Sequence, residues 1–345
     1  MGDAIDRRRR LLLGAALSGM AAIDAGLTAK AHAQAKAPAA TRTSVLRRLE
    51  PLRHVETDVL SIACFEEGPA TGPAVILLHG FPYDIHTYAD VAAILAAKGC
   101  RVIVPCLRGY GETSFRDTAM PRSGEQAALG ADVIALIDAL HIERAVFAGH
   151  NWGGRAATVA AALWPDRCAG LVTVNSYLIQ DMSRAMVPSA PENEEAMWYE
   201  YYFQLERGRA GLATNRRRIA RMLWEEWSPD WDFDDATFDR SAAALDNPDF
   251  VDVAIHSYRH RFGNADGDPR YAELAKRLAA MPPITVPSVT LDGDSDGVVA
   301  AGDGSTSAAR FAGRRIHRVV KGAGHNVPQE APEAFAAGVM ELVRA

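Results

Sequence analysis

The 345-residue chain has few cysteines, no excess of positive charge and no long apolar run beyond its first residues. Its four cysteines, Cys64, Cys100, Cys106 and Cys168, form no CxxC pair and no metal-ligand spacing, which argues against a disulfide scaffold or a zinc module. Cys100 and Cys106 flank one predicted strand and so lie too far apart to pair with each other. We therefore expect buried free thiols. The formal net charge of −6 disfavours nucleic acid as a partner.

The N-terminus has the pattern of an export signal. Four arginines precede a Leu/Ala/Gly-rich stretch, and the run from Arg8 to Leu12 resembles a twin-arginine signal. Asp24 interrupts the apolar stretch, which argues against a stable membrane span and leaves a basic tail or a short anchor as the alternatives. We predict a signal at 1–35, a linker at 36–44, and a periplasmic or secreted protein with no stable membrane span after signal removal. Two small-x-small cleavage sites fit this prediction: Ala31-His32-Ala33 and Ala33-Gln34-Ala35.

Beyond the linker, short apolar strands alternate with helical patterns, which is typical of a mostly parallel sheet covered by helices on both faces. Strands are predicted in VLSIACFE (59–66), AVILLHG (74–80), RVIVPCL (101–107), RAVFAGH (144–150), GLVTVNS (170–176), SVTLDGD (288–294) and RRIHRVVKG (314–322). Helices are predicted at 88–98, 124–140 and 154–163.

Residues 177–275 break this alternation, because they are rich in Trp, Tyr, Arg and Glu and have a mainly helical pattern. The strand pattern resumes at Ser288. We predict a helical cap at 177–275 inserted into an α/β core formed by 45–176 and 276–345. The alternative is that this segment is simply the helical half of one domain.

The stretch VFAGHNWGGRAA (146–157) predicts a buried strand, a tight turn and an alanine-rich helix. Gly149, Gly153 and Gly154 flank Asn151 and permit a close approach of strand and helix. Such an elbow presents one reactive side chain, yet the carboxamide of Asn151 is a poor nucleophile. An ordinary strand-to-helix turn would account for the glycines equally well.

Three further turns, each after a predicted strand, complete a pattern. In LLHGFPYD the backbone N–H of Phe81 would face a developing oxyanion together with that of Trp152. A later turn places Asp296 at the carboxyl edge of the sheet, where it can orient a histidine, and His325 follows in a glycine-rich turn. The order elbow, acid, histidine predicts an α/β-hydrolase fold. Two other acids compete for the role of Asp296: Asp292 and Asp294.

Over residues 45–345 the chain resembles the α/β-hydrolase superfamily, and within it the epoxide hydrolases and their haloalkane-dehalogenase relatives. The motifs HGFP (79–82), RGYGETS (108–114) and GHNWGG (149–154) carry this resemblance. The family has Gly-His-Asp-Trp-Gly-Gly in the last motif, and its Asp is the nucleophile. The resemblance therefore puts Asn151 at the nucleophile position, where the chain departs from the family pattern.

The resemblance also implies two cap tyrosines whose hydroxyls hydrogen-bond the epoxide oxygen. WYEYYFQLERG (198–208) is similar to the first segment, which would make the residue Tyr199, with Tyr201 or Tyr202 as alternatives. IHSYRHRFG matches the second segment, which would make it Tyr258. Aromatic packing within the cap is the alternative role for both tyrosines.

The implied reaction converts a small apolar or aromatic epoxide to a vicinal diol through a covalent ester, with water as the second reactant and no metal or cofactor. A pocket between cap and sheet would bind this substrate with Phe81, Trp152, Trp198 and Phe203. One alternative is a dehalogenase-like hydrolase that holds halide with Trp152 and a cap tryptophan, Trp198 or Trp224. Another is a catalytically silent ligand-binding protein. The sequence leaves the oligomeric state undefined.

The neutral side chain of Asn151 predicts an enzyme with most or all of its turnover lost. Four explanations fit the residue. The replacement of Asp was made to silence or trap the enzyme, or it is a natural loss that leaves a ligand-binding protein. Alternatively, water activated by His325 hydrolyses the amide to Asp, or that water attacks the substrate directly while Asn151 positions it.

Overall fold

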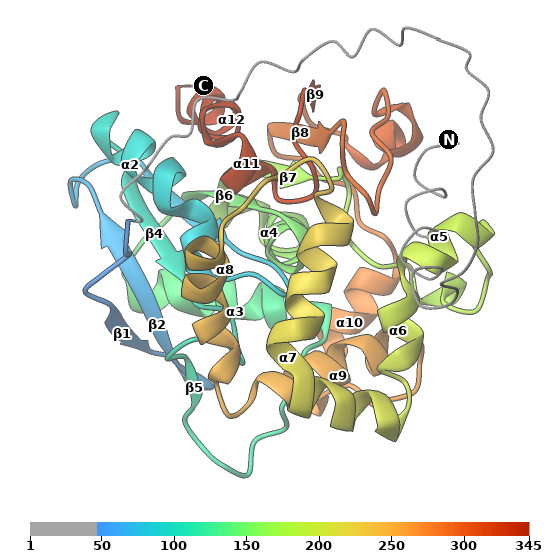
Figure 1. Ribbon diagram of the computed structural model, residues 1–345. Coiled ribbons are helices and arrows are strands. Elements are labelled where there is room, and N and C mark those ends of the chain that lie inside the picture. Colours follow the sequence, from blue (N-terminus) through green and yellow to red (C-terminus); the bar gives the residue numbers. More distant parts are fainter. Residues whose placement is uncertain (1–46, 345) are drawn as a thin grey trace, which may run out of the picture. The chain divides into compact units, whose positions relative to one another are not determined.

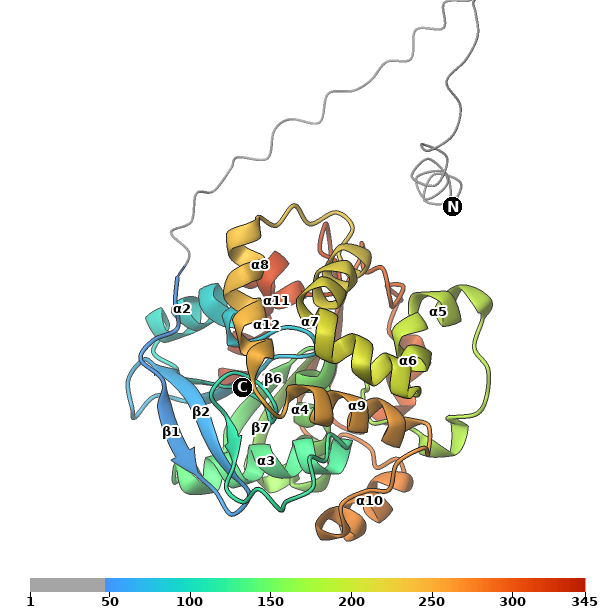
Figure 2. The same cartoon turned by 60° about the horizontal axis from the view of Figure 1, so that its bottom comes forward.

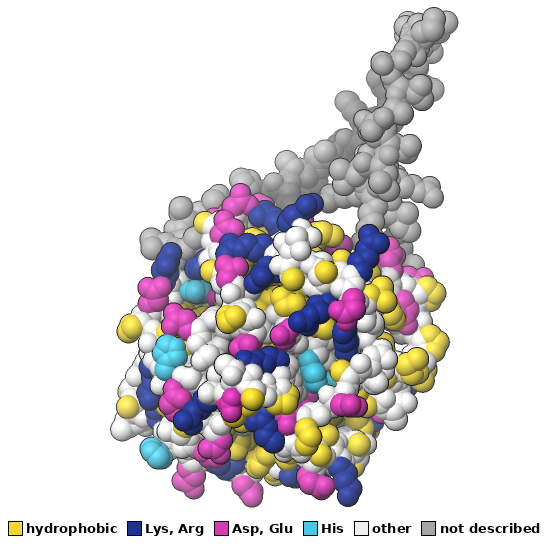
Figure 3. Space-filling view, turned by 90° about the horizontal axis from the view of Figure 1, so that it is seen from below, with side chains coloured by type: hydrophobic (Ala, Val, Ile, Leu, Met, Phe, Trp, Pro, Cys, Tyr) yellow, Lys and Arg dark blue, Asp and Glu magenta, His cyan; other side chains and the backbone are white. Residues whose placement is uncertain are grey.

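The computed structural model describes residues 47–344. The predicted export signal and the linker lie outside the described residues, so the location of the protein stays a prediction. Within residues 47–344, no helix is both long enough and apolar enough to cross a bilayer. Charged residues of both signs are interspersed with hydrophobic ones on the face shown in Figure 3.

The core is a nine-stranded sheet in the order β1-β2-β4-β3-β6-β7-β8-β9, with β5 paired to β2 (Figure 1). Strands β4, β3, β6, β7, β8 and β9 run parallel, whereas β1 and β2 form an antiparallel edge. The predicted mostly parallel sheet is confirmed. Its strands are β1 (Arg53–Glu56), β2 (Leu60–Glu67), β3 (Ala74–Leu78), β4 (Arg101–Pro105), β5 (Ser114–Phe115), β6 (Ala145–Gly149), β7 (Cys168–Val174), β8 (Ser288–Gly293) and β9 (Arg315–Val320).

Two short strands were not predicted from the sequence. In β1 only Val55 is buried, so the strand has no apolar alternation to identify it. Strand β5 contains two residues and forms because Leu60 and Ser61 of β2 pair with it. Both elements depend on pairing with β2 rather than on a local pattern.

Helices cover both faces of the sheet (Figures 1 and 2). On one face α3 (Gln126–Ala139) and α4 (Asn151–Leu163) pack together, and on the other lie α2 (Ala89–Ala97), α11 (Val327–Glu330) and α12 (Pro332–Val343). The α3–α4 contact is close, since a Cβ on Gly130 would lie 2.2 Å from Cγ1 of Val159. The small alanines of α4 therefore bury that helix directly against the strands.

A helical insertion follows β7 and precedes β8. Its helices are α5 (Pro191–Ala196), α6 (Trp198–Tyr202), α7 (Glu206–Trp227), α8 (Asp235–Ala242), α9 (Phe250–Arg261) and α10 (Ala272–Ala279). The last of these, α10, spans the predicted cap–core boundary at residue 275 and packs against α3 and α4 of the core. The boundaries of the cap stay predictions.

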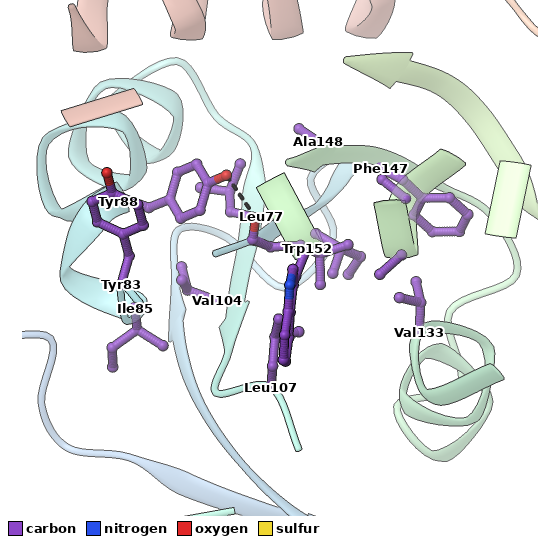
Figure 4. Close-up of a cluster of buried hydrophobic side chains, with 14 of the residues drawn as sticks. Leu77, Tyr83, Ile85, Tyr88, Val104, Leu107, Val133, Phe147, Ala148 and Trp152 are labelled. Carbon is purple, nitrogen blue, oxygen red and sulfur yellow. Dashed lines mark hydrogen bonds between the residues drawn. The ribbon is translucent and has the colours of Figure 1, made fainter. Parts of the chain in front are cut away.

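The buried cluster between sheet and helices includes both Tyr88 and Trp152 (Figure 4). The Tyr88 hydroxyl donates to the carbonyl of Leu78 at 2.8 Å, which ties η1 (Ile85–Tyr88) to the end of β3. All four cysteines are buried free thiols, as predicted. Burial raises the pKa of the Cys64 thiol to about 11, so this thiol is a protonated packing residue.

Candidate active site

The predicted elbow is present at the junction of β6 and α4. His150 is extended, and Asn151 has a φ of +52°, in the left-handed region that few residues other than glycine adopt. A Cβ on Gly153 would lie 1.9 Å from the carbonyl oxygen of Leu78, and one on Gly80 would lie 2.4 Å from Cβ of Asn151. Only glycine permits β3 and α4 to approach so closely around Asn151.

Two backbone N–H groups hold the amide oxygen of Asn151. The Phe81 N–H donates to Oδ1 at 3.2 Å, and the Trp152 N–H donates to the same atom at 2.6 Å. These are the two groups that the sequence predicted as oxyanion donors. With aspartate at position 151, one carboxylate oxygen would stand where this amide oxygen stands.

His325 lies on the other side of the Asn151 amide. Its Nε2 is 3.0 Å from Nδ2 of Asn151, and its Nδ1 is 2.9 Å from Oδ2 of Asp296. Because a carboxylate only accepts, Nδ1 carries the proton, and the Nε2 lone pair accepts from the amide. The structure thus brings the three predicted residues into one hydrogen-bonded chain.

Asp296 is fully buried and receives several donors. Oδ1 accepts from the backbone N–H groups of Val298 at 2.8 Å and Val299 at 3.0 Å, and Oδ2 also accepts from Nδ2 of Asn175 at 3.1 Å. Burial acts to raise the pKa of Asp296, but the charge and hydrogen bond of His325, with the two backbone donors, outweigh burial and lower it. Asp296 is therefore ionised in the folded protein at neutral pH.

The competing acids lie in other interactions. Asp292 accepts from the backbone N–H of Gly302 at 3.1 Å, and Asp294 accepts from that of Gly322 at 2.6 Å. Neither carboxylate contacts His325 within the described chain. The structure therefore separates Asp296 from both alternatives, which the sequence could not.

A buried support below His325 was not predicted. The backbone N–H of His325 contacts Oγ of Ser228 at 3.1 Å, and Ser228 donates to Glu330 at 2.6 Å. The second oxygen of Glu330 accepts from the Gly324 N–H at 2.7 Å, and the Trp227 ring lies 5.1 Å from the imidazole. Ser228 follows α7 in the middle of the insertion, so no local sequence pattern links it to the histidine.

The two predicted cap tyrosines meet above the elbow, on α6 and α9, which lie side by side (Figures 1 and 2). The Tyr199 and Tyr258 rings are 5.4 Å apart at 86°. Burial raises the pKa of Tyr199 and of Tyr258, so both hydroxyls are neutral donors at physiological pH. The alternative Tyr201 is 45% exposed, which removes it from this pair. Tyr202 packs its ring against Trp198 and Phe203.

Aromatic rings enclose the elbow, with Phe81 at their centre. Its ring stacks on Trp152 at 5.6 Å and contacts Tyr258 at 5.3 Å and Phe203 at 6.1 Å. Trp198, also predicted to contact substrate, packs its ring on Tyr199 and donates its indole N–H to Glu226 at 3.1 Å. Trp198 therefore supports the cluster through Tyr199, whereas Trp152 and Phe203 each contact Phe81 directly.

Among residues 47–344, no group of three or more His, Cys, Asp or Glu side chains is arranged to hold a metal ion. The site brings together a side chain at the elbow, a histidine–aspartate pair, two backbone donors and two neutral phenols. That the reaction needs no cofactor stays a prediction from the resemblance.

Residues 73–332 match the model of the alpha/beta hydrolase fold family, and the chain belongs to that family. The predicted α/β-hydrolase fold is thereby confirmed. Within the family the chain is related to epoxide hydrolases. It is 27% identical over 316 residues to epoxide hydrolase A of Mycobacterium tuberculosis, and this match spans 84% of this chain and 96% of the relative.

Two further comparisons agree with this relationship. Epoxide hydrolase B of the same organism is 33% identical over 153 residues, a match that spans 40% of this chain and 41% of the relative. A crystal structure from Klebsiella pneumoniae, described as a candidate epoxide hydrolase, has 45% sequence identity and a TM-score of 0.84. That likeness covers 86% of this chain and 98% of the Klebsiella chain.

Proposed function

We propose that this chain is an epoxide hydrolase-type enzyme, built to open a small apolar or aromatic epoxide to a vicinal diol. One observation carries the proposal. Two buried neutral tyrosines, Tyr199 and Tyr258, pack against Phe81, whose backbone N–H holds the elbow side chain beside His325. Phenol donors suit an epoxide oxygen that departs on the side away from the nucleophile, whereas the histidine itself protonates the leaving oxygen of an ordinary ester.

With aspartate at position 151 the reaction has two steps. The carboxylate attacks an epoxide carbon, a C–O bond of the ring breaks, and the alkoxide takes a proton from a tyrosine hydroxyl. His325 then removes a proton from water, whose oxygen attacks the ester carbonyl. The Phe81 and Trp152 N–H groups hold the tetrahedral oxyanion. Collapse releases the diol, with the proton returned by His325 to the leaving oxygen. The tyrosinate then takes the proton of the new carboxylic acid, which restores both the tyrosine hydroxyl and the carboxylate.

Asn151 impairs the first of these steps. A carboxamide oxygen has no full negative charge, and the amide N–H occupies the Nε2 lone pair of His325 at 3.0 Å. The protein with Asn151 should therefore turn over on the order of 10⁶-fold more slowly than the aspartate form, the size of loss that removal of a covalent nucleophile causes in other hydrolases.

Diol formation from a panel of small epoxides tests the proposal. The protein with Asn151 and the Asn151→Asp variant are assayed side by side. The matched control is Asn151→Ala, which measures epoxide opening that needs no polar side chain at position 151. Turnover by the aspartate form alone supports an epoxide hydrolase whose activity Asn151 suppresses. If no epoxide is opened by any of the three, the proposal fails.

One observation favours dehalogenation as a second candidate. The indole N–H groups of Trp152 and Trp227 are buried and have no acceptor among the described residues, and such donors suit a halide ion. The two cap tryptophans considered from the sequence, Trp198 and Trp224, already have protein acceptors. The Trp198 N–H donates to Glu226 and that of Trp224 donates to the Pro82 carbonyl at 3.3 Å. Halide release by the Asn151→Asp variant from chloro- and bromoalkanes would distinguish this activity.

A further inference from the structure

A hollow lies between α4, α9 and the loop that follows β7. Its volume is about 270 Å³, and its walls include Arg155, Arg184 and Arg261 together with one carboxylate, Asp181. The reaction described above uses none of these side chains. Three arginines around one small cavity need an explanation of their own.

Two of the arginines are poorly solvated. Arg155 donates from Nε to the carbonyl of Leu178 at 3.3 Å, and within residues 47–344 no carboxylate lies within 4.0 Å of its guanidinium. The Arg261 side chain is 19% exposed and pairs with the buried carboxylate of Glu200. The Gln180 side-chain amide also contacts Arg261. Of the two inner arginines, Arg155 and Arg261, the carboxylate of Glu200 thus contacts only Arg261.

The electrostatics agree with this arrangement. Burial lowers the pKa of Arg155 to about 10. Burial, and then the charge of Arg155, lower the pKa of Arg261 to about 9. Both guanidinium groups remain charged at neutral pH. With Arg184, the three arginines exceed the two carboxylates at this site, Asp181 and Glu200, by one positive charge. A bound monoanion would balance it.

The cavity adjoins the groups that carry the reaction. Arg155 follows Asn151 by four residues at the start of α4, a rise of about 6 Å, and its guanidinium is close enough to Tyr258 and Tyr199 for an electrostatic interaction with both. Arg261 follows Tyr258 by three residues on α9, and its guanidinium carbon is 5.3 Å from the centre of the Tyr258 ring. A ligand with one end at the elbow and the other in this cavity needs only a short carbon chain.

We propose that Arg155 and Arg261 form a carboxylate-binding subsite, and that the substrate is an epoxide with a carboxylate a few carbon atoms from its ring. The inference rests on the proposed function for the epoxide, and on the cavity alone for the acid. A guanidinium fork matches the two oxygens of a carboxylate, and the single unbalanced charge suits a monoanion. The subsite would fix which epoxide carbon meets residue 151.

The first experiment compares kcat/KM of the Asn151→Asp variant for a terminal epoxypentanoate and for its methyl ester. We expect the acid to be preferred by roughly 10- to 100-fold, as for a hydrogen bond to a charged group. Arg155→Met should abolish the preference, and Arg155→Lys should retain part of it. The control is Arg218→Met, at an exposed arginine of α7, which should keep the full preference.

The second experiment needs no turnover and uses the protein with Asn151. Calorimetric titration should detect hexanoate binding and weaker or absent hexanamide binding. The Arg155→Met variant should lose this difference while its melting temperature stays unchanged. If kcat/KM is the same for the ester and the acid, the subsite is refuted while the proposed function stands. If no epoxide is opened but hexanoate binds through Arg155, the subsite stands and the proposed function fails. Equal binding of hexanoate and hexanamide overturns the subsite.

Discussion

Replacing Asp296 by asparagine in the Asn151→Asp protein should separate the two steps of the reaction. Oδ1 of Asp296 accepts from the N–H groups of Val298 and Val299 at 2.8 and 3.0 Å, whereas Oδ2 faces Nδ1 of His325 at 2.9 Å. An asparagine must keep its oxygen toward the two backbone donors, because the opposite orientation would leave both N–H groups facing the donor NH₂ of the amide. Its NH₂ group then faces the imidazole.

This orientation changes the tautomer of His325. In the Asp296→Asn variant, Nδ1 of His325 must accept a hydrogen bond from the new amide NH₂ group, so the ring proton moves to Nε2 and that atom can no longer take a proton from water. A wrong tautomer of this kind lowers the rate by roughly 10⁴-fold in a serine protease, or about 5.5 kcal/mol of activation free energy. The alkylation step needs only the Asp at position 151 and the tyrosine hydroxyls, so it should remain fast.

The covalent ester should therefore accumulate. Intact-protein mass spectrometry after mixing with epoxide should show one adduct of the epoxide's mass per chain, and the steady-state diol rate should fall by about 10⁴-fold. The Asn151 protein, which lacks the nucleophile, is the control and should show no adduct. Diol production within tenfold of the parent rate would refute the assignment of His325 and Asp296 as the hydrolytic pair.

Three further outcomes follow from the contacts. Gly153→Ala places a Cβ 1.9 Å from a carbonyl oxygen of β3 and should destabilise the fold by about 3 kcal/mol or more in denaturant unfolding, whereas exposed Gly302→Ala should cost no more than about 0.5 kcal/mol. The pKa of Asp296 is lowered on folding, so its carboxylate stabilises the protein above the ordinary carboxyl pKa of about 3.9, and this contribution is lost as the pH falls through the lower folded value. The difference in melting temperature between the parent and Asp296→Asn should accordingly shrink below that pH. On storage, hydrolysis of the Asn151 amide by water that His325 activates should add about 1 Da to its peptide. An unchanged mass, or equal gain in His325→Ala, would exclude self-repair.

Much of this arrangement could be predicted because the relevant residues follow strands. Parallel strands bring their carboxyl ends to one edge of a sheet, so turns after β3, β6, β8 and β9 must meet there. The glycine spacing around Asn151 independently predicts the elbow. Sequence order alone thus predicts that Asn151, Asp296 and His325 lie near one another.

The supporting residues could not be predicted in this way. Ser228 contacts His325 from within the insertion and reaches it only because the insertion folds back over the sheet. Asn175 follows β7 and contacts Asp296 at the carboxyl edge of the sheet, but no motif marks it. Arg155 lies inside the elbow stretch, yet nothing local indicates that Arg261 lies at the same cavity. Such partners depend on how α9 docks against α4, which is a property of packing rather than of periodicity.

Under the proposed function, the contacts of Asn151 indicate which of its properties would limit the reaction. Asparagine keeps the contacts expected of an aspartate oxygen, with Phe81 and Trp152 donating to Oδ1, and adds one hydrogen bond to His325. Breaking that added bond to free Nε2 costs about 1 kcal/mol, or roughly fivefold in rate. A loss on the order of 10⁶-fold cannot come from this occupation. The missing negative charge must account for nearly all of it, so the Asn151→Asp comparison measures the nucleophile itself rather than a rearranged site.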